Sequence, residues 1–116
     1  METLGLQALA AIDAWGASNP GLIVEKLGPT WRRVRLGADG LQLLNYRATA
    51  AAHQEPFLDN ASEDEVASLR ERLGRPADVI YPYGRSNSKG ALIRIRDVKE
   101  LDAIRDVLMK RVSITS

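Results

Sequence analysis

Two short runs flank the Asp39-Gly40 dipeptide, and together they constrain the fold of this chain more than any other feature. Residues 30–36 and 41–47 each combine apolar or aromatic side chains with polar ones, and Asp-Gly between two such runs is a strong local signal for a β-hairpin. Whether the loop has two or four residues, even positions of the first strand share a face with odd positions of the second. The face expected to pack on the core carries Arg32, Val34, Leu36, Leu41, Leu43 and Asn45, and the face expected to be partly exposed carries Trp31, Arg33, Arg35, Gln42, Leu44 and Tyr46.

The first 24 residues are nearly free of charge, because Glu2 and Asp13 are their only charged side chains. Apolar residues recur there every three or four positions, which is typical of a helix with a wide apolar face that another part of the protein must cover. These residues are Leu4, Ala8, Ala11, Ile12 and Trp15. Pro20 suits the first turn of a helix. We therefore expect a second, short helix over residues 20–27, ended by the Gly-Pro pair that follows.

The second half of the chain is predicted to hold a helix over residues 62–73, a hairpin with strands 78–83 and 91–96, and a final helix over residues 97–111. Both helices begin with the spacing of a capping box, in which a polar N-cap residue is followed three positions later by glutamate. Residues 48–60 contain no clear period, and we expect them to be irregular.

These elements predict a single domain over residues 1–116 with the order ααββαββα. The fold class is α+β, with two antiparallel β-hairpins forming a small sheet packed on helices. Helices on one side of such a sheet leave its other face open to solvent. We expect that open face to carry the function.

The composition excludes several kinds of site. The chain has no cysteine, so it has no disulfide framework, no cysteine-ligated zinc and no thiol nucleophile, and a reducing, cytoplasmic setting of bacterial or phage type is expected. No apolar run approaches the roughly 20 residues that cross a bilayer, so no membrane role is expected. His53 is the only histidine, and the acidic residues at 59–65 lack calcium-loop spacing. We therefore predict no metal, no cofactor and no catalytic residues.

Charge is unevenly distributed although the net charge is only +1. Residues 28–54 carry four arginines and one aspartate, residues 55–65 carry five acids and no base, and residues 66–96 carry seven bases and two acids, which gives +3, −5 and +5. Both basic blocks coincide with predicted hairpins. Twelve of the sixteen bases are arginine, whose planar fork binds phosphate or carboxylate and stacks on flat groups.

The candidate partner-binding residues come from the two hairpins. Aromatic and cationic side chains on one sheet face can hold bases and backbone together, although a cross-strand aromatic pair and a solvated arginine face are the commoner explanations of such patterns. Arg96 is also placed to pair with Asp78 across the second hairpin. The candidates are Trp31, Arg33, Arg35 and Tyr46 on the first hairpin, Arg94 and Arg96 on the second, and Arg85 and Lys89 in its loop.

The leading hypothesis is a small non-catalytic binding or regulatory protein whose arginine-bearing hairpins engage an anionic partner, either nucleic acid or the acidic surface of a protein that handles nucleic acid. One alternative is a protein–protein accessory, inhibitor or homodimeric module whose interface is the uncharged N-terminal segment with Leu6, Leu9 and Trp15. A lesser alternative is a small enzyme with a pocket of arginine and tyrosine side chains.

Overall fold

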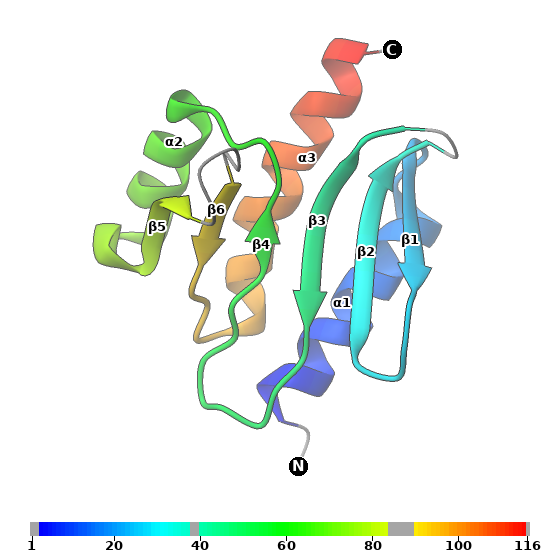
Figure 1. Cartoon of the computed structure of the whole chain (residues 1–116), viewed down its shortest axis with the longest axis horizontal. Coiled ribbons are helices and arrows are strands. Elements are labelled where there is room, and N and C mark those ends of the chain that lie inside the picture. Colours follow the sequence, from blue (N-terminus) through cyan, green and yellow to red (C-terminus); the bar gives the residue numbers. More distant parts are fainter. Residues whose placement is uncertain (1–2, 38–39, 84–89, 116) are drawn as a thin grey trace.

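The computed structural model describes residues 3–37, 40–83 and 90–115, and these residues form an α+β fold with three α-helices and one six-stranded antiparallel sheet (Figure 1). The elements are α1 (Leu4–Ser18), β1 (Leu22–Lys26), β2 (Trp31–Leu36), β3 (Gln42–Arg47), β4 (Phe57–Leu58), α2 (Glu63–Leu73), the 3₁₀ helix η1 (Pro76–Asp78), β5 (Val79–Tyr83), β6 (Gly90–Ile93), the 3₁₀ helix η2 (Val98–Glu100) and α3 (Leu101–Thr115). The strand order is β1-β2-β3-β4-β6-β5. The predicted fold class is confirmed, although the sheet contains more strands than the two hairpins.

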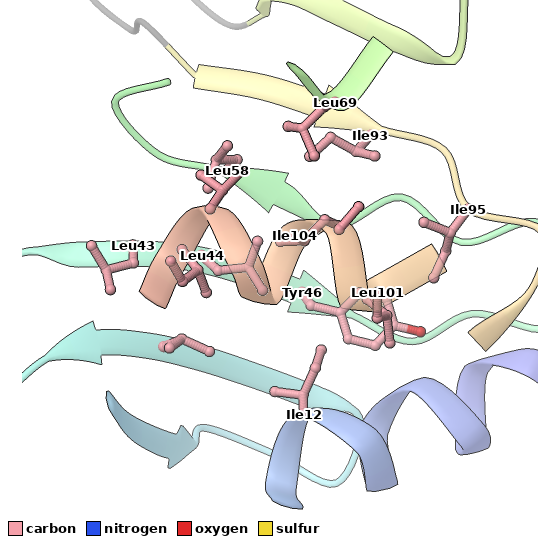
Figure 2. Packing of buried hydrophobic residues seen from close by; sticks show 14 of the residues in the cluster. Ile12, Leu43, Leu44, Tyr46, Leu58, Leu69, Ile93, Ile95, Leu101 and Ile104 are labelled. Carbon is pink, nitrogen blue, oxygen red and sulfur yellow. The ribbon is translucent and has the colours of Figure 1, made fainter. Parts of the chain in front are cut away.

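The helices pack on one face of the sheet. Figure 1 shows α1 and α3 behind the strands, with α2 beside β5. In Figure 2, Leu101 of α3 lies near Tyr46 of β3, and Leu69 of α2 lies beside Ile93 of β6. These side chains are almost completely buried. The core is therefore a single layer between the sheet and its helices, and none of the helices in the described residues lies over the opposite sheet face.

The helix ends follow the local sequence. Ser62 accepts a hydrogen bond from the Glu65 amide at 3.1 Å, and the Glu65 side chain accepts one from the Ser62 amide at 2.9 Å, so the predicted capping box begins α2. Gly74 ends α2 in the left-handed conformation, with φ of 69°. A second capping box, between Asp97 and Glu100, begins η2 and leads into α3. Local hydrogen bonding therefore accounts for these boundaries.

The predicted short helix over residues 20–27 is wrong, because this segment is strand β1. Leu22 to Lys26 pair with Leu36 to Arg32 of β2 in antiparallel register. Gly21 has a φ of 100°, which no residue of a right-handed helix adopts. Pro20 therefore belongs to the turn before a strand, and pairing with β2 outweighs the weak local preference for a helix.

The predicted assignment of side chains to the two faces of the first hairpin is confirmed near the turn and is wrong for the part of β3 beyond it. Arg35 lies opposite Gln42 as expected, but the register shifts, so that Val34 lies opposite Leu44 and Arg32 opposite Tyr46. A β-bulge places one extra residue in β3, and Leu43 and Leu44 are both buried. Every later side chain of β3 is therefore on the opposite face from the predicted one.

The predicted irregular segment 48–60 contributes a strand that joins the two hairpins. Phe57 and Leu58 form β4, which pairs with β3 on one side and with β6 on the other. Gln54 forms an isolated bridge with Ile95. Two hairpins thus become one continuous sheet through a strand too short to show a period in the sequence.

The N-terminal segment is a helix, as predicted, but it does not offer the expected interface. Leu9 and Trp15 are each only 5% exposed and belong to the core. Leu6 is exposed. The apolar face of this helix is thus covered by the rest of the chain, and the predicted interface of Leu6, Leu9 and Trp15 is wrong for two of its three residues. Among the described residues, no helix is both long and apolar enough to cross a membrane.

Candidate binding surface on the open face of the sheet

The open face, defined here as the side chains that point away from the helices, contains one continuous cross-strand row. Glu25 of β1 lies opposite Arg33 of β2, Arg33 opposite Asn45 of β3, Asn45 opposite Phe57 of β4, and Phe57 opposite Leu92 of β6. The row brings together side chains that are as much as 67 positions apart in the sequence. All five lie between the fully buried core and full exposure, as expected for a sheet face without a covering layer.

A hollow of about 400 Å³ opens beside this row, and we call it the open-face hollow. It lies where the chain leaves β3 after Arg47 and returns toward β4 from residue 55, so that the two segments no longer pair. Its lining residues are Trp31, Asn45, Arg47, Thr49, Ala51, His53, Glu55, Tyr83 and Leu92. The hollow therefore combines aromatic, cationic, acidic and amide groups on one surface.

The buried side chain of Gln54 holds the loop beside the hollow. Its amide nitrogen donates to the carbonyl oxygens of Thr49 and Ala51, both at 3.0 Å, and its amide oxygen accepts from the Thr49 amide at 3.0 Å. The same oxygen accepts from the Tyr46 hydroxyl at 2.7 Å. Burial raises the pKa of Tyr46 to about 12, so its hydroxyl remains a donor throughout the neutral range. These bonds give the loop a definite shape although it has no regular secondary structure.

Trp31 and Arg47 form a flat platform at one side of the open-face hollow. The two residues lie opposite each other on β2 and β3, and the Arg47 guanidinium lies 4.5 Å from the centroid of the Trp31 ring. The indole N–H of Trp31 donates a hydrogen bond to the side-chain oxygen Oδ1 of Asn45 at 2.6 Å, which sets the orientation of the ring. A planar cation stacked on a fixed aromatic ring can receive a further flat, electron-rich group.

A second aromatic pair joins β4 to the second hairpin, and its tyrosine, Tyr83, borders the hollow. Phe57 and Tyr83 have ring centroids 6.1 Å apart at 58°. Gly90 makes this contact possible, because a Cβ at that position would lie 1.9 Å from the end of the Phe57 ring. Tyr83 is exposed and lines the hollow, whereas Tyr81 packs against the core. The two tyrosines of β5 therefore lie on opposite sides of the sheet and do not line one pocket.

The predicted arginines of the first hairpin lie on the open face, and one of them is already engaged. Arg35 donates to the Gly40 carbonyl oxygen at 3.1 and 3.3 Å and lies 3.8 Å from the Glu25 carboxylate. Arg33 is half-buried, and its Nε–H has no hydrogen-bond acceptor within the described part of the chain. The structure thus gives the Arg35 guanidinium an acceptor, the Gly40 carbonyl oxygen, and gives none to the buried Arg33 Nε–H within the described residues.

The predicted arginines of the second hairpin each pair with an acid. Arg94 donates from Nε to Glu55 Oε2 at 2.9 Å. Arg96 lies 3.4 Å from Asp78, so the predicted cross-hairpin pair is confirmed. These contacts reduce the positive charge that either arginine offers to a partner.

Tyr46 does not belong to this surface. The sequence predicted that it shares a face with Trp31, but it is 1% exposed and lies in the core opposite Arg32. The bulge in β3 causes this reversal, because it turns Tyr46 toward the helices and Asn45 and Arg47 away from them. Arg85 and Lys89 lie outside the described residues.

The residues that complete the surface were not predicted from the sequence; they are Asn45, Arg47, His53, Glu55, Phe57 and Leu92. Asn45 and Arg47 lie on the open face only because of the bulge in β3, and the sequence holds no evident signal for that bulge. His53 and Glu55 lie in a segment without a period. Arg47 belongs to the basic block of residues 28–54. An aromatic residue on the neighbouring strand is the one sequence feature that points to its place in the site.

Acidic groups keep the open face close to neutral. Arg33, Arg35, Arg47 and Arg94 share it with Glu25, Glu55 and Asp59. Burial raises the pKa of Asp59, while a hydrogen bond from Gln42 and the nearby Arg111 and Arg33 act in the opposite direction. Attraction of an anion to this face therefore depends on individual guanidinium groups and not on a broad positive field.

No family model, curated protein or solved structure matches this chain. The candidate site therefore has to be judged by its chemistry alone. Among residues 3–37, 40–83 and 90–115, no group of three or more histidine, aspartate or glutamate side chains is arranged to hold a metal ion.

Proposed function

We propose that this protein is a non-catalytic binding protein whose open face takes single-stranded nucleic acid. The observation that carries the proposal is the Trp31–Arg47 platform beside the open-face hollow, where the guanidinium lies 4.5 Å from the ring centroid. Unpaired bases stack on aromatic rings and on arginine planes, while nearby arginines contact the phosphates. Helices on one face of an antiparallel sheet and aromatic side chains on the other are one arrangement by which proteins bind single strands.

The chemistry of the open face favours a single strand over the other anionic partners. A duplex offers its bases only through its grooves, which are read by a protruding helix or ribbon, whereas this face is an uncovered sheet with a hollow. An acidic protein surface would be attracted mainly by charge, and the open face is nearly neutral because Glu25, Glu55 and Asp59 accompany its arginines. Stacking remains available at neutral charge. A reducing, cytoplasmic setting belongs to the same proposal, since the chain has no cysteine.

The first experiment measures binding of fluorescently labelled, mixed-sequence single-stranded RNA and DNA of about 12 nucleotides, a length in the range that such folds cover. We expect binding that weakens as salt rises from about 50 to 200 mM, because phosphate contacts release counterions. Trp31→Ala and Arg47→Ala are each expected to weaken binding by about fivefold or more, the lower end of what one stacked base contributes.

Arg105→Ala provides the matched control, because Arg105 lies on α3 and pairs with Asp102 and Asp106, away from the open face. This variant is expected to bind like the unaltered protein. Absence of binding at low salt, equal affinity for a duplex of the same sequence, or equal losses in the Arg105 and Arg47 variants would each contradict the proposal.

The protein–protein alternative loses most of its predicted surface. Leu9 and Trp15 pack in the core, and of the three expected interface residues only Leu6 remains exposed. Sedimentation analysis of the isolated chain tests what is left of the homodimer hypothesis: a monomer at high concentration removes it.

A further inference from the structure

We propose that Glu55, which lines the open-face hollow, and its ion-pair partner Arg94 select a guanine base. This inference rests on the proposed function, because it names which base of a single strand enters the hollow. Glu55 places a negative charge in a surface that is proposed to bind an anionic polymer. Glu55 lines the same hollow as Trp31 and Tyr83, and a carboxylate there repels a phosphate. The hollow must therefore meet a part of the ligand that donates hydrogen bonds, and in a nucleic acid strand that part is the edge of a base.

The ion pair leaves hydrogen-bonding capacity free on both residues. Arg94 uses its Nε–H to donate to Oε2 of Glu55 at 2.9 Å, and the two side chains are 42% and 39% exposed. An ionised carboxylate is an acceptor only, with room for about four hydrogen bonds, and a guanidinium offers five N–H groups. Glu55 therefore offers acceptors to the hollow, and the donors of Arg94 lie next to that carboxylate.

Guanine satisfies this pair with more hydrogen bonds than any other base. Its Watson–Crick edge has two adjacent donors, N1–H and the N2 amino group, next to the acceptor O6. A carboxylate accepts from both donors, and the neighbouring guanidinium donates to O6. Adenine and cytosine each place one donor beside an acceptor, and uracil places one N–H between two carbonyl oxygens. These three bases offer the carboxylate a single donor, so one hydrogen bond is lost.

The Trp31–Arg47 platform and the Glu55–Arg94 pair act on different parts of the same nucleotide, because the platform contacts the face of the base and the pair contacts its edge. Stacking on the Trp31–Arg47 platform is available to every base, because every base has a flat face. Selection therefore depends on Glu55, and replacing it is expected to abolish the preference for guanine, whereas the platform contributes to the binding of every base. This separation distinguishes a specificity-determining residue from one that merely supports the loop.

The test uses uridine nonamers whose central residue is guanosine, inosine, adenosine or uridine, with affinity measured by fluorescence anisotropy. The guanosine oligomer is expected to bind about tenfold more tightly than all-uridine RNA, within the range that a well-placed base contact contributes. Inosine, which lacks the N2 amino group, is expected to lie between them. Glu55→Gln is expected to remove the preference, so that the guanosine and uridine oligomers bind with the same affinity. Glu71→Gln, on the exposed side of α2, is the matched control and is expected to retain the preference.

The outcomes separate this inference from the proposed function. If the unaltered protein binds all four oligomers equally, guanine selection is wrong while single-strand binding stands. If Glu55→Gln weakens all four oligomers equally, Glu55 supports the structure and does not select the base. If the unaltered protein binds none of them, the proposed function itself fails.

Discussion

Single residues determine the shape of the candidate site, and Gln54 is the clearest example. Its buried amide connects Tyr46 in the core with Thr49 and Ala51 in the loop beside the open-face hollow. A buried side chain that satisfies several backbone groups is costly to replace, because each group left without a partner retains its desolvation cost. Gln54 therefore stabilises the loop around Thr49 and Ala51, which has no regular secondary structure.

Replacing Gln54 with leucine is expected to lower the free energy of unfolding by about 2–4 kcal/mol, since several buried polar groups lose their partners. Gln42→Leu is the matched control, because within the described residues the Gln42 side chain makes one hydrogen bond, to the half-buried Asp59. Urea unfolding of both variants tests this. Equal losses in the two variants would show that the buried network contributes nothing beyond an ordinary surface contact.

At the scale of the elements, the first turn of α1 lies very close to the loop after β3. Gly5 is buried at the first turn of α1, and a Cβ there would lie 2.7 Å from the carbonyl oxygen of Thr49. Glycine is a poor helix former, so its presence at this position has a packing reason. The same contact brings the helix against the segment that lines the open-face hollow.

Gly5→Ala is expected to destabilise the protein, although alanine is favoured over glycine in a helix by about 1 kcal/mol. The steric conflict is with a backbone atom, which cannot rotate away. Ala10→Gly, at an exposed position of the same helix, measures the helix-propensity effect alone. Thermal unfolding distinguishes the two effects, and a Gly5→Ala variant more stable than the unaltered protein would contradict the packing argument.

At the scale of the whole molecule, ion pairs connect the helices to one another and to the second hairpin. Arg75 contacts Asp78 at 2.6 Å and Glu100 at 2.7 Å, which joins η1 to η2. Arg111 of α3 contacts Glu65 of α2 at 2.7 Å. A hydrogen bond from Arg75 is the main cause that lowers the pKa of Asp78 and of Glu100. Burial raises the pKa of Glu65, but hydrogen bonds from Arg111 and Ser62 outweigh it, so that pKa is also lowered.

These lowered pKa values predict the direction of acid sensitivity. A carboxyl group with a lower pKa in the folded than in the unfolded state stabilises the fold above its ordinary pKa, and this stabilisation is lost as the pH falls through the folded value. The free energy of unfolding is therefore expected to decrease from about pH 4, near the ordinary carboxyl pKa, toward lower pH. The pKa of Asp59 is raised, so this one carboxyl group acts in the opposite direction and favours the folded state as the pH falls.

Urea unfolding between about pH 6 and 3 measures this dependence. Arg75→Ala is the informative variant, because its stability difference from the unaltered protein is expected to shrink as Asp78 and Glu100 become protonated. Arg105→Ala, which removes more exposed ion pairs, is expected to show little such change. A stability of the unaltered protein that stays constant over this range would contradict the role of these pairs.

Local signals in the sequence determined the elements whose ends depend on neighbouring residues. Ser62 with Glu65 and the glycine at position 74 bound α2, and the apolar spacing of residues 4–15 identifies α1, because caps and helical periods are formed within a few residues. The two hairpins, the α+β class and an open sheet face carrying Trp31, Arg33 and Arg35 followed from the same short-range patterns.

The tertiary structure alone decided the features that depend on distant partners. Strand β1 forms because β2 pairs with it, and β4 forms because two hairpins meet on either side of it. One bulged residue in β3 sends Tyr46 into the core and Arg47 to the surface, since side chains alternate and a single extra residue reverses all that follow. The open-face hollow exists for the same reason: His53 and Glu55 reach Trp31 only through the folded loop that Gln54 holds, and no spacing in the sequence records that contact.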